Sequence, residues 1–130
     1  MTALGMTRAL LVGAGGFAGA IARYLVGAAV QRTFAPSFPW ATFLVNASGC
    51  FAIGFLAVIA DERFAIGPEA RLFWIAGVLG GYTTFSTFGY ETVLLARAGS
   101  HGLAIANALG QVLAGLLAVW AGASVARSLT

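Results

Sequence analysis

Long stretches without a charged residue are the feature that most constrains how this chain can fold. Three of them cover residues 39–60, 72–90 and 102–126, and each has the roughly 17–25 residues that a helix needs to cross a bilayer. A fourth, residues 9–22, is interrupted by Arg23 and continues over residues 24–31. The pattern predicts an all-α membrane protein with one four-helix transmembrane domain, residues 1–130, with spans at approximately residues 8–32, 39–60, 71–97 and 102–126.

The composition argues against a water-facing surface. Only 8% of the residues are charged and 60% are hydrophobic, whereas soluble domains carry about 25% charged residues. We therefore expect a multi-pass protein of the cell inner (plasma) membrane, surrounded by the lipid bilayer. The net charge is +3, but the arginines are scattered rather than clustered on one face, so no nucleic-acid partner is expected.

The first apolar stretch also has features of a signal peptide. Arg8 precedes the apolar run, and residues 18–20 (Ala-Gly-Ala) resemble a cleavage site. Because the apolar pattern continues past that point, a membrane span is the favoured interpretation. The single cysteine, Cys50, lies inside the second span, so an intrachain disulfide is excluded and a packing role is expected.

The distribution of arginine predicts almost no preferred orientation in the membrane. With four spans, the N-terminus, the loop between the second and third spans, and the C-terminus lie on one side. Cytoplasmic loops usually carry an excess of Lys and Arg. Here the arginines of that side are Arg8, Arg63, Arg71 and Arg127, and those of the other side are Arg32, Arg97 and, if it reaches that surface, Arg23. This near balance predicts insertion in both orientations and pairing of inverted copies, with a single dominant loop as the alternative.

Small residues recur at a spacing that favours close helix packing. Gly15 and Gly19 are four residues apart in the first span, and Gly77 and Gly81 repeat that spacing in the third. Such pairs let helix backbones approach closely in lipid. The glycines therefore predict tight contacts between helices.

The third span contains a segment that predicts a break in its helix. Residues 80–84 read Gly-Gly-Tyr-Thr-Thr, and irregular backbone at membrane depth survives only inside protein or beside a polar cavity. If the helix unwinds there, the freed carbonyl oxygens suit a hard cation such as Na⁺, and the freed N–H groups suit an anion. The alternative is a simple glycine kink whose carbonyls are satisfied by neighbouring hydroxyls.

Three carboxamides within the spans are candidates for a polar pathway. Asn46 lies in the second span and offers two N–H donors. Asn107 and Gln111 are four residues apart on the fourth span and share a helix face. They form either a polar track for a solute or hydrogen bonds that join the helices, and the sequence leaves both interpretations open.

Two rings and two hydroxyls follow the predicted break. Phe85 and Phe88 are three residues apart and lie on one helix face, with Ser86 and Thr87 between them in sequence. Because the edge of an aromatic ring is electropositive, this group could meet a small anion without a full charge. Packing against lipid or protein is the alternative for such a phenylalanine pair.

Two ionisable residues within the spans are candidates for functional roles. Arg23 lies late in the first span and Glu91 lies late in the third. Charged groups inside a membrane are costly and so indicate function by default. Arg23 could instead extend its charge to the interface, attract an anion, or pair with Glu91.

Three of these segments together resemble the Fluc/CrcB family of small dimeric fluoride channels. They read GGFAGAIARY over residues 15–24, TFLVNASGCF over residues 42–51 and GGYTTFSTF over residues 80–88. The resemblance covers nearly the full length, and the third segment is the most specific. It implies an antiparallel, dual-topology homodimer with two pores that conduct fluoride passively out of the cell.

The resemblance also implies roles for individual residues. A structural, non-transported Na⁺ would be held by the main-chain carbonyls of Gly80 and Thr83. Phe85 and Phe88 match the family's pore phenylalanines, and Glu91 matches its vestibule glutamate. Further expected members of the fluoride pathway are Asn46, Ser86, Thr87, Asn107 and Gln111, and Arg23 is expected in the vestibule or its support.

Two departures from the family pattern concern the polar track. Gly89 stands where a serine is common, and Asn107 with Gln111 stand where hydroxyl residues often line the fourth helix. The cation site is undisturbed, because it uses backbone atoms.

Other classes of membrane protein fit the sequence less well. A small multidrug-type proton-coupled exporter would need a carboxylate in the first span, which has none. A structural subunit of a larger complex would explain the glycines but not the hydroxyls and rings after the break. An enzyme is not expected, since no nucleophile–base pair or metal cluster is apparent and the lone His101 lies between the third and fourth spans.

Overall fold

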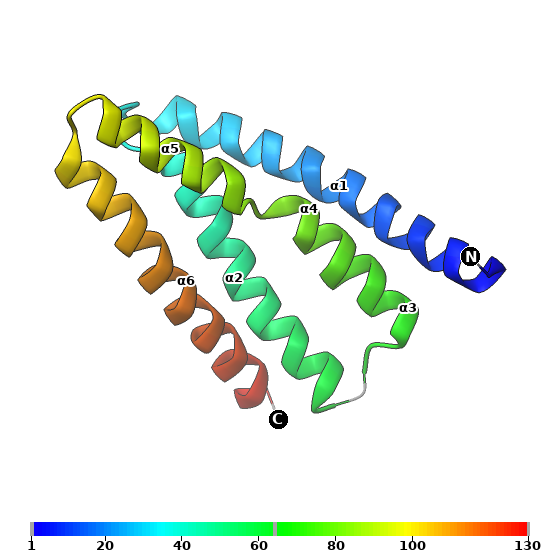
Figure 1. Ribbon diagram of the computed structural model, residues 1–130. Coiled ribbons are helices and arrows are strands. Elements are labelled where there is room, and N and C mark those ends of the chain that lie inside the picture. Colours follow the sequence, from blue (N-terminus) through cyan, green and yellow to red (C-terminus); the bar gives the residue numbers. More distant parts are fainter. Residues whose placement is uncertain (1, 64, 130) are drawn as a thin grey trace.

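The computed structural model describes residues 2–63 and 65–129, and within them every regular element is helical (Figure 1). The prediction of an all-α chain is therefore confirmed. The elements are α1 (Ala3–Thr33), α2 (Trp40–Asp61), α3 (Pro68–Arg71), η1 (Leu72–Leu79), α4 (Gly80–Tyr82), α5 (Phe85–Arg97) and α6 (His101–Ser128).

These elements form four rods, because α3, η1, α4 and α5 follow one another along one line (Figure 1). The two termini and the loop between α2 and α3 lie at one end, and the other two connections lie at the opposite end. Among the described residues, α1, α2 and α6 are each long and apolar enough to cross a membrane. The third rod does not form one continuous helix.

The interruption of the third rod is shorter than the sequence predicted. Gly80–Tyr82 are helical, and only Thr83 (ψ 159°) and Thr84 (ψ 113°) are extended. The expected unwinding over residues 80–84 is thus corrected to two residues. A threonine suits this position because its hydroxyl caps the helix that follows: Thr84 Oγ1 accepts a hydrogen bond from the Thr87 N–H at 3.3 Å.

The first half of the third rod is a π-helix, which the sequence did not predict. It covers the eight residues Leu72–Leu79. π-type turns are rare, usually single turns within α-helices, and are frequently found at functional sites. Here the π-helix ends next to α4 and the interruption.

Glycines bring α1 against the third rod, which is a close helix contact of the kind that the spacing of small residues predicted. A Cβ added at Gly15 would lie 2.3 Å from the Phe73 carbonyl oxygen, and one at Gly19 would lie 2.0 Å from that of Val78. Such distances leave no room for any side chain, so the two backbones are in direct contact.

A second glycine interface joins α2 to α6. A Cβ at Gly54 would lie 2.1 Å from the Val119 carbonyl oxygen, and one at Gly122 would lie 2.1 Å from that of Phe51. The four rods are therefore arranged as two close pairs, α1 with η1 and α4, and α2 with α6.

Ion pairs fasten the end of the bundle that carries both termini. Arg127, near the end of α6, lies 2.6 Å from Glu62, and Arg71 pairs with Asp61 across the loop between α2 and α3. Hydrogen bonds from Arg127 hold the pKa of Glu62 below its usual value. These contacts fix the two loop ends to each other outside the apolar spans.

Candidate functional site

Asn46, on α2, satisfies both backbone polar groups of Thr84 at the interruption. Its Nδ2 donates to the Thr84 carbonyl oxygen at 3.0 Å, and its Oδ1 accepts from the Thr84 N–H at 2.8 Å. Gly49, one turn further along α2, leaves room for the break, since a Cβ there would lie 2.3 Å from Thr83 Cγ2. The extended backbone is thus hydrogen-bonded by the Asn46 side chain, and the absence of a side chain at Gly49 leaves space for it.

This arrangement diverts the hydrogen-bond donors of two backbone carbonyls. In a continuous α-helix the Thr84 N–H would donate to the Gly80 carbonyl and the Thr87 N–H to the Thr83 carbonyl. Here the Thr84 N–H donates to Asn46 and the Thr87 N–H donates to Thr84 Oγ1. The two carbonyls that the resemblance assigns to a cation are therefore released from their helical donors.

The donor set fits a hard monovalent cation. Carbonyl oxygens are the ligands that such ions prefer, and each has two lone pairs. Arg23 Nη1 donates to the Thr83 carbonyl oxygen at 3.4 Å, which leaves that oxygen a second lone pair. No group of three or more His, Cys, Asp or Glu side chains that could hold a metal exists in the described part of the chain.

A cavity of about 460 Å³, here called the central cavity, lies beside the interruption. Asn46, Phe85, Phe88 and Gln111 line it together with the backbone around Gly80 and Thr83. Cys50 is also among the lining residues, and it is a free, partly buried thiol. The structure thus brings together, around one space, most of the residues that the sequence nominated on three different spans.

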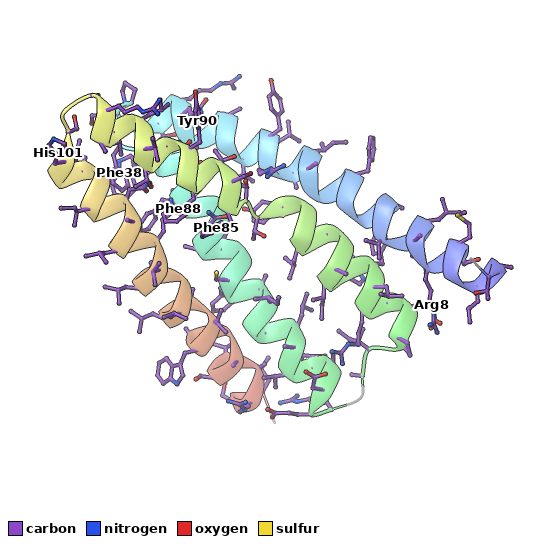
Figure 2. All side chains as sticks on the ribbon, in the orientation of Figure 1. Arg8, Phe38, Phe85, Phe88, Tyr90 and His101 are labelled. Atoms are coloured by element: carbon purple, nitrogen blue, oxygen red, sulfur yellow. The ribbon has the colours of Figure 1, made fainter. Side chains whose placement is uncertain are left out.

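Phe85 and Phe88 occupy the first turn of α5, directly after the interruption (Figure 2). Their ring centroids are 5.4 Å apart and the rings are tilted by 50°. Phe85 is 82% exposed in the protomer. In a single copy of the chain the pair therefore covers one wall of the central cavity and leaves it open on another side.

The three carboxamides form one hydrogen-bonded series between α2, α6 and α5, here called the amide series. Asn46 Nδ2 donates to Gln111 Oε1 at 2.8 Å, and Gln111 Nε2 donates to Asn107 Oδ1 at 2.9 Å. Asn107, which is fully buried, donates through Nδ2 to Thr92 Oγ1 at 2.9 Å. Thr92 Oγ1 in turn donates to the Phe88 carbonyl oxygen at 2.8 Å. Helix joining, one of the two interpretations of Asn107 and Gln111, is observed.

Arg23 and Glu91 line another space of about 300 Å³, here called the lateral cavity, which also borders the interruption. Thr87 lines it as well, and Thr84 lines both cavities. Glu91 Oε1 accepts from the Thr42 hydroxyl at 2.9 Å, and its Oε2 is buried without a hydrogen-bond partner among the described residues. Among the described residues, Arg23 and Glu91 do not form an ion pair with each other.

Sequence comparison places these residues in a known family. The family model described as "CrcB-like protein, Camphor Resistance (CrcB)" matches residues 10–123. The chain belongs to the CrcB family. The matched segment includes every residue of both cavities and of the amide series.

The relatives with curated names are similar over almost their whole length. A protein of Solibacter usitatus, named fluoride-specific ion channel FluC, is 47% identical over 91% of this chain and 97% of its own. Proteins with the same name from Rhizobium meliloti and from Chlorobaculum tepidum are 44% and 46% identical, over 95% and 94% of this chain and 99% and 96% of their own. With three helices able to span a membrane, this CrcB chain is a multi-pass protein of the bacterial plasma membrane.

Sequence reasoning missed the partners that hold the CrcB site residues in place. The sequence indicates Thr84 as part of the break but not as the cap of α5. It indicates neither Thr42 as the partner of Glu91 nor Thr92 as the partner of Asn107. Thr84 could have been found, because threonine is among the residues preferred at the position just before a helix begins. Thr42 and Thr92 carry no such local signal.

Ser86 is exposed and hydrogen-bonds Thr84 Oγ1 at 3.3 Å.

Proposed function

We propose that this chain is a fluoride-selective ion channel that allows passive export of fluoride from the cytoplasm. The observation that carries the proposal is the gathering of Asn46, Phe85, Phe88 and Gln111 around one cavity beside an interrupted helix. The names of relatives that are nearly half identical over nine-tenths of the chain support the same conclusion. Transport rather than an enzymatic reaction is the function that this family membership supports.

Selectivity for fluoride requires many weak contacts instead of one strong site. Fluoride is small and strongly hydrated, so a pathway must replace its water while leaving no room for chloride. Ring edges of Phe85 and Phe88 and the donors of Ser86, Thr87 and Gln111 are weak partners of this kind. Weak partners suit conduction, because an ion has to leave as readily as it enters.

The proposed channel is an antiparallel homodimer. Phe85 is largely exposed in the protomer, Gly80 is exposed as well, and both residues line the central cavity. An inverted second copy would close the cavity and bring a second set of rings to it. The near balance of arginines at the two ends supports insertion in both orientations.

A structural Na⁺ is part of the proposal. The carbonyl oxygens of Gly80 and Thr83 would hold it, since the interruption diverts their helical donors. When bound, the ion supplies a fixed positive charge that compensates these oxygens. The chain's own part is to hold the two carbonyls in place through Asn46 and Thr84.

The test is release of fluoride from liposomes that contain the purified protein, followed with a fluoride electrode. We expect rapid release of fluoride, slow release of chloride, and no dependence on a proton gradient. Phe85→Ile should abolish most of the fluoride flux, because it removes a ring from the central cavity. Phe17→Ile is the matched control, since Phe17 is 72% exposed on α1 and lines neither cavity.

Two results would contradict the proposal. Unchanged flux in Phe85→Ile would remove the ring from the pathway. Transport that requires a proton gradient would favour the proton-coupled exporter instead.

A further inference from the structure

The amide series has a fixed direction, because each of its ends is a backbone group. It starts at the Thr84 N–H, which can only donate, and it ends at the Phe88 carbonyl oxygen, which can only accept. Each carboxamide between them must therefore turn its oxygen toward Thr84 and its nitrogen toward Phe88. The orientations of Asn46, Gln111 and Asn107 are set by the same rule.

This direction determines which donors remain for an ion in the central cavity. Both N–H groups of Asn46 are used, one by the Thr84 carbonyl and one by Gln111. Gln111 uses one N–H on Asn107, and because a carboxamide has two, one further N–H remains on a side chain that lines the cavity. Asn107 also keeps one N–H, but its side chain is fully buried and does not line the central cavity. Asn46 thus supports the pathway, and Gln111 is the member of the series that has a free donor at the cavity.

Thr92 connects the amide series to α5 and maintains the direction of its hydrogen bonds there. Its single hydroxyl proton is given to the Phe88 carbonyl oxygen, so its oxygen can only accept from Asn107. If the hydroxyl were lost, the Asn107 nitrogen would be left fully buried without this acceptor, which is costly. The link also ties α6 to the turn of α5 that carries Phe88.

We propose that Thr92 is a positioning residue of the ion pathway. It acts through Asn107 on the orientation of the Gln111 carboxamide, and through the Phe88 carbonyl on the placement of the Phe88 ring at the central cavity. The inference rests on the proposed fluoride conduction. It assigns to Thr92 no contact with the ion.

The experiment uses liposomes that contain so little protein that most hold one channel or none. The initial slope of fluoride release then reports the rate of one channel, and the final fraction released reports how many vesicles contain a working channel. Thr92→Val keeps the shape of the side chain and removes the hydroxyl, and Thr92→Ser keeps the hydroxyl. Thr33→Val is the matched control, because the Thr33 hydroxyl donates to the carbonyl oxygen four residues earlier at 3.1 Å but lies on the exposed end of α1.

We expect Thr92→Val to slow the rate about tenfold, the change that corresponds to one hydrogen bond of a buried amide, at an unchanged final fraction. Thr92→Ser should stay within about twofold of the unmodified protein, and Thr33→Val should match it. Thr92→Ala is the second variant and should resemble Thr92→Val.

Three outcomes would overturn the inference. The first is an unchanged rate in both Thr92→Val and Thr92→Ala. The second is a lower final fraction at an unchanged rate, or failure of both variants to fold, and the third is a slow rate in Thr92→Ser. The first removes the positioning role, the second shows a purely structural one, and the third shows that the hydroxyl is not what matters. Absence of fluoride release from the unmodified protein would instead contradict the proposed function, so the two failures are distinguishable.

Discussion

At the scale of single residues, Asn46 explains how a helix can be interrupted in an apolar surrounding. Thr84 has both of its backbone polar groups outside the helical pattern, and Asn46 pairs with each of them. An unpaired peptide group in such a place costs several kcal/mol. The sequence nominated Asn46, Phe85 and Phe88 for one pathway, and the structure places all three around the central cavity. The sequence could not show that both N–H groups of Asn46 are used, by the Thr84 carbonyl and by Gln111.

Asn46→Asp should abolish fluoride release. A carboxylate has no N–H to offer the Thr84 carbonyl or Gln111 Oε1, and it places a negative charge beside both oxygens. Leaving one such group unpaired costs about 1–3 kcal/mol. The measurement is fluoride release together with the elution position of the protein in detergent.

Gln31→Glu makes the same amide-to-carboxylate change at an exposed residue of α1 that lines the lateral cavity but not the central cavity, and it should keep more flux than Asn46→Asp. Normal flux in Asn46→Asp would show that these donors are dispensable.

At the scale of the elements, glycine contacts decide which helices pair. The spacing of Gly15, Gly19, Gly77 and Gly81 predicted close helix contacts, and the structure shows that these glycines join α1 to the third rod. The interruption and the π-helix were less predictable. Gly80 and Gly81 suggested that the helix would unwind at the glycines, but glycine permits a helical conformation as well, and the capping by Thr84 placed the break two residues later.

Gly54→Ala should destabilise the protein, whereas Gly13→Ala should not. A methyl group at Gly54 would lie 2.1 Å from the Val119 carbonyl oxygen, and the space around a Cβ at Gly13 is open to 4 Å. Overpacking costs about 1–3 kcal/mol, while alanine is the better helix former by about 0.5–1 kcal/mol.

Thermal unfolding in detergent measures this difference. We expect a lower midpoint for Gly54→Ala and an equal or higher one for Gly13→Ala. Equal midpoints for both variants would show that α2 and α6 can separate without loss.

At the scale of the whole molecule, the four rods place both termini at one end (Figure 1). Arg8 lies on α1 toward that end, and His101 begins α6 at the other end (Figure 2). Two of the arginines at the first end, Arg71 and Arg127, are paired with Asp61 and Glu62 at the C-terminal end of α2. These pairs offset part of the positive charge at that end, so neither end of the bundle carries a dominant field.

A tag at the C-terminus should be accessible on both sides of the native membrane in comparable amounts. The reason is the balance of arginines between the two ends. Labelling of the tag in intact cells and in inverted vesicles measures it. One added arginine in the loop of residues 98–100 should shift the ratio, and a tag found on one side only would contradict dual topology.

Removal of Na⁺ should slow fluoride release and weaken the association of two copies. The carbonyl oxygens of Gly80 and Thr83 would then lack both their helical donors and a cation. The comparison is between vesicles prepared in sodium salts and in salts of a large organic cation. Equal rates and equal dimer content in both would count against a structural sodium site.

The sequence alone determined that this is an all-α membrane protein, because uncharged spans and small-residue spacing are local patterns, and its break and intramembrane polar residues nominated candidates for a site. The tertiary structure decided what each polar group does. Residues 46, 84, 92, 107 and 111 are separated along the chain but joined in space by the amide series. A carboxamide can point either way, and only the fixed backbone groups at Thr84 and Phe88, brought together by helix packing, select its direction.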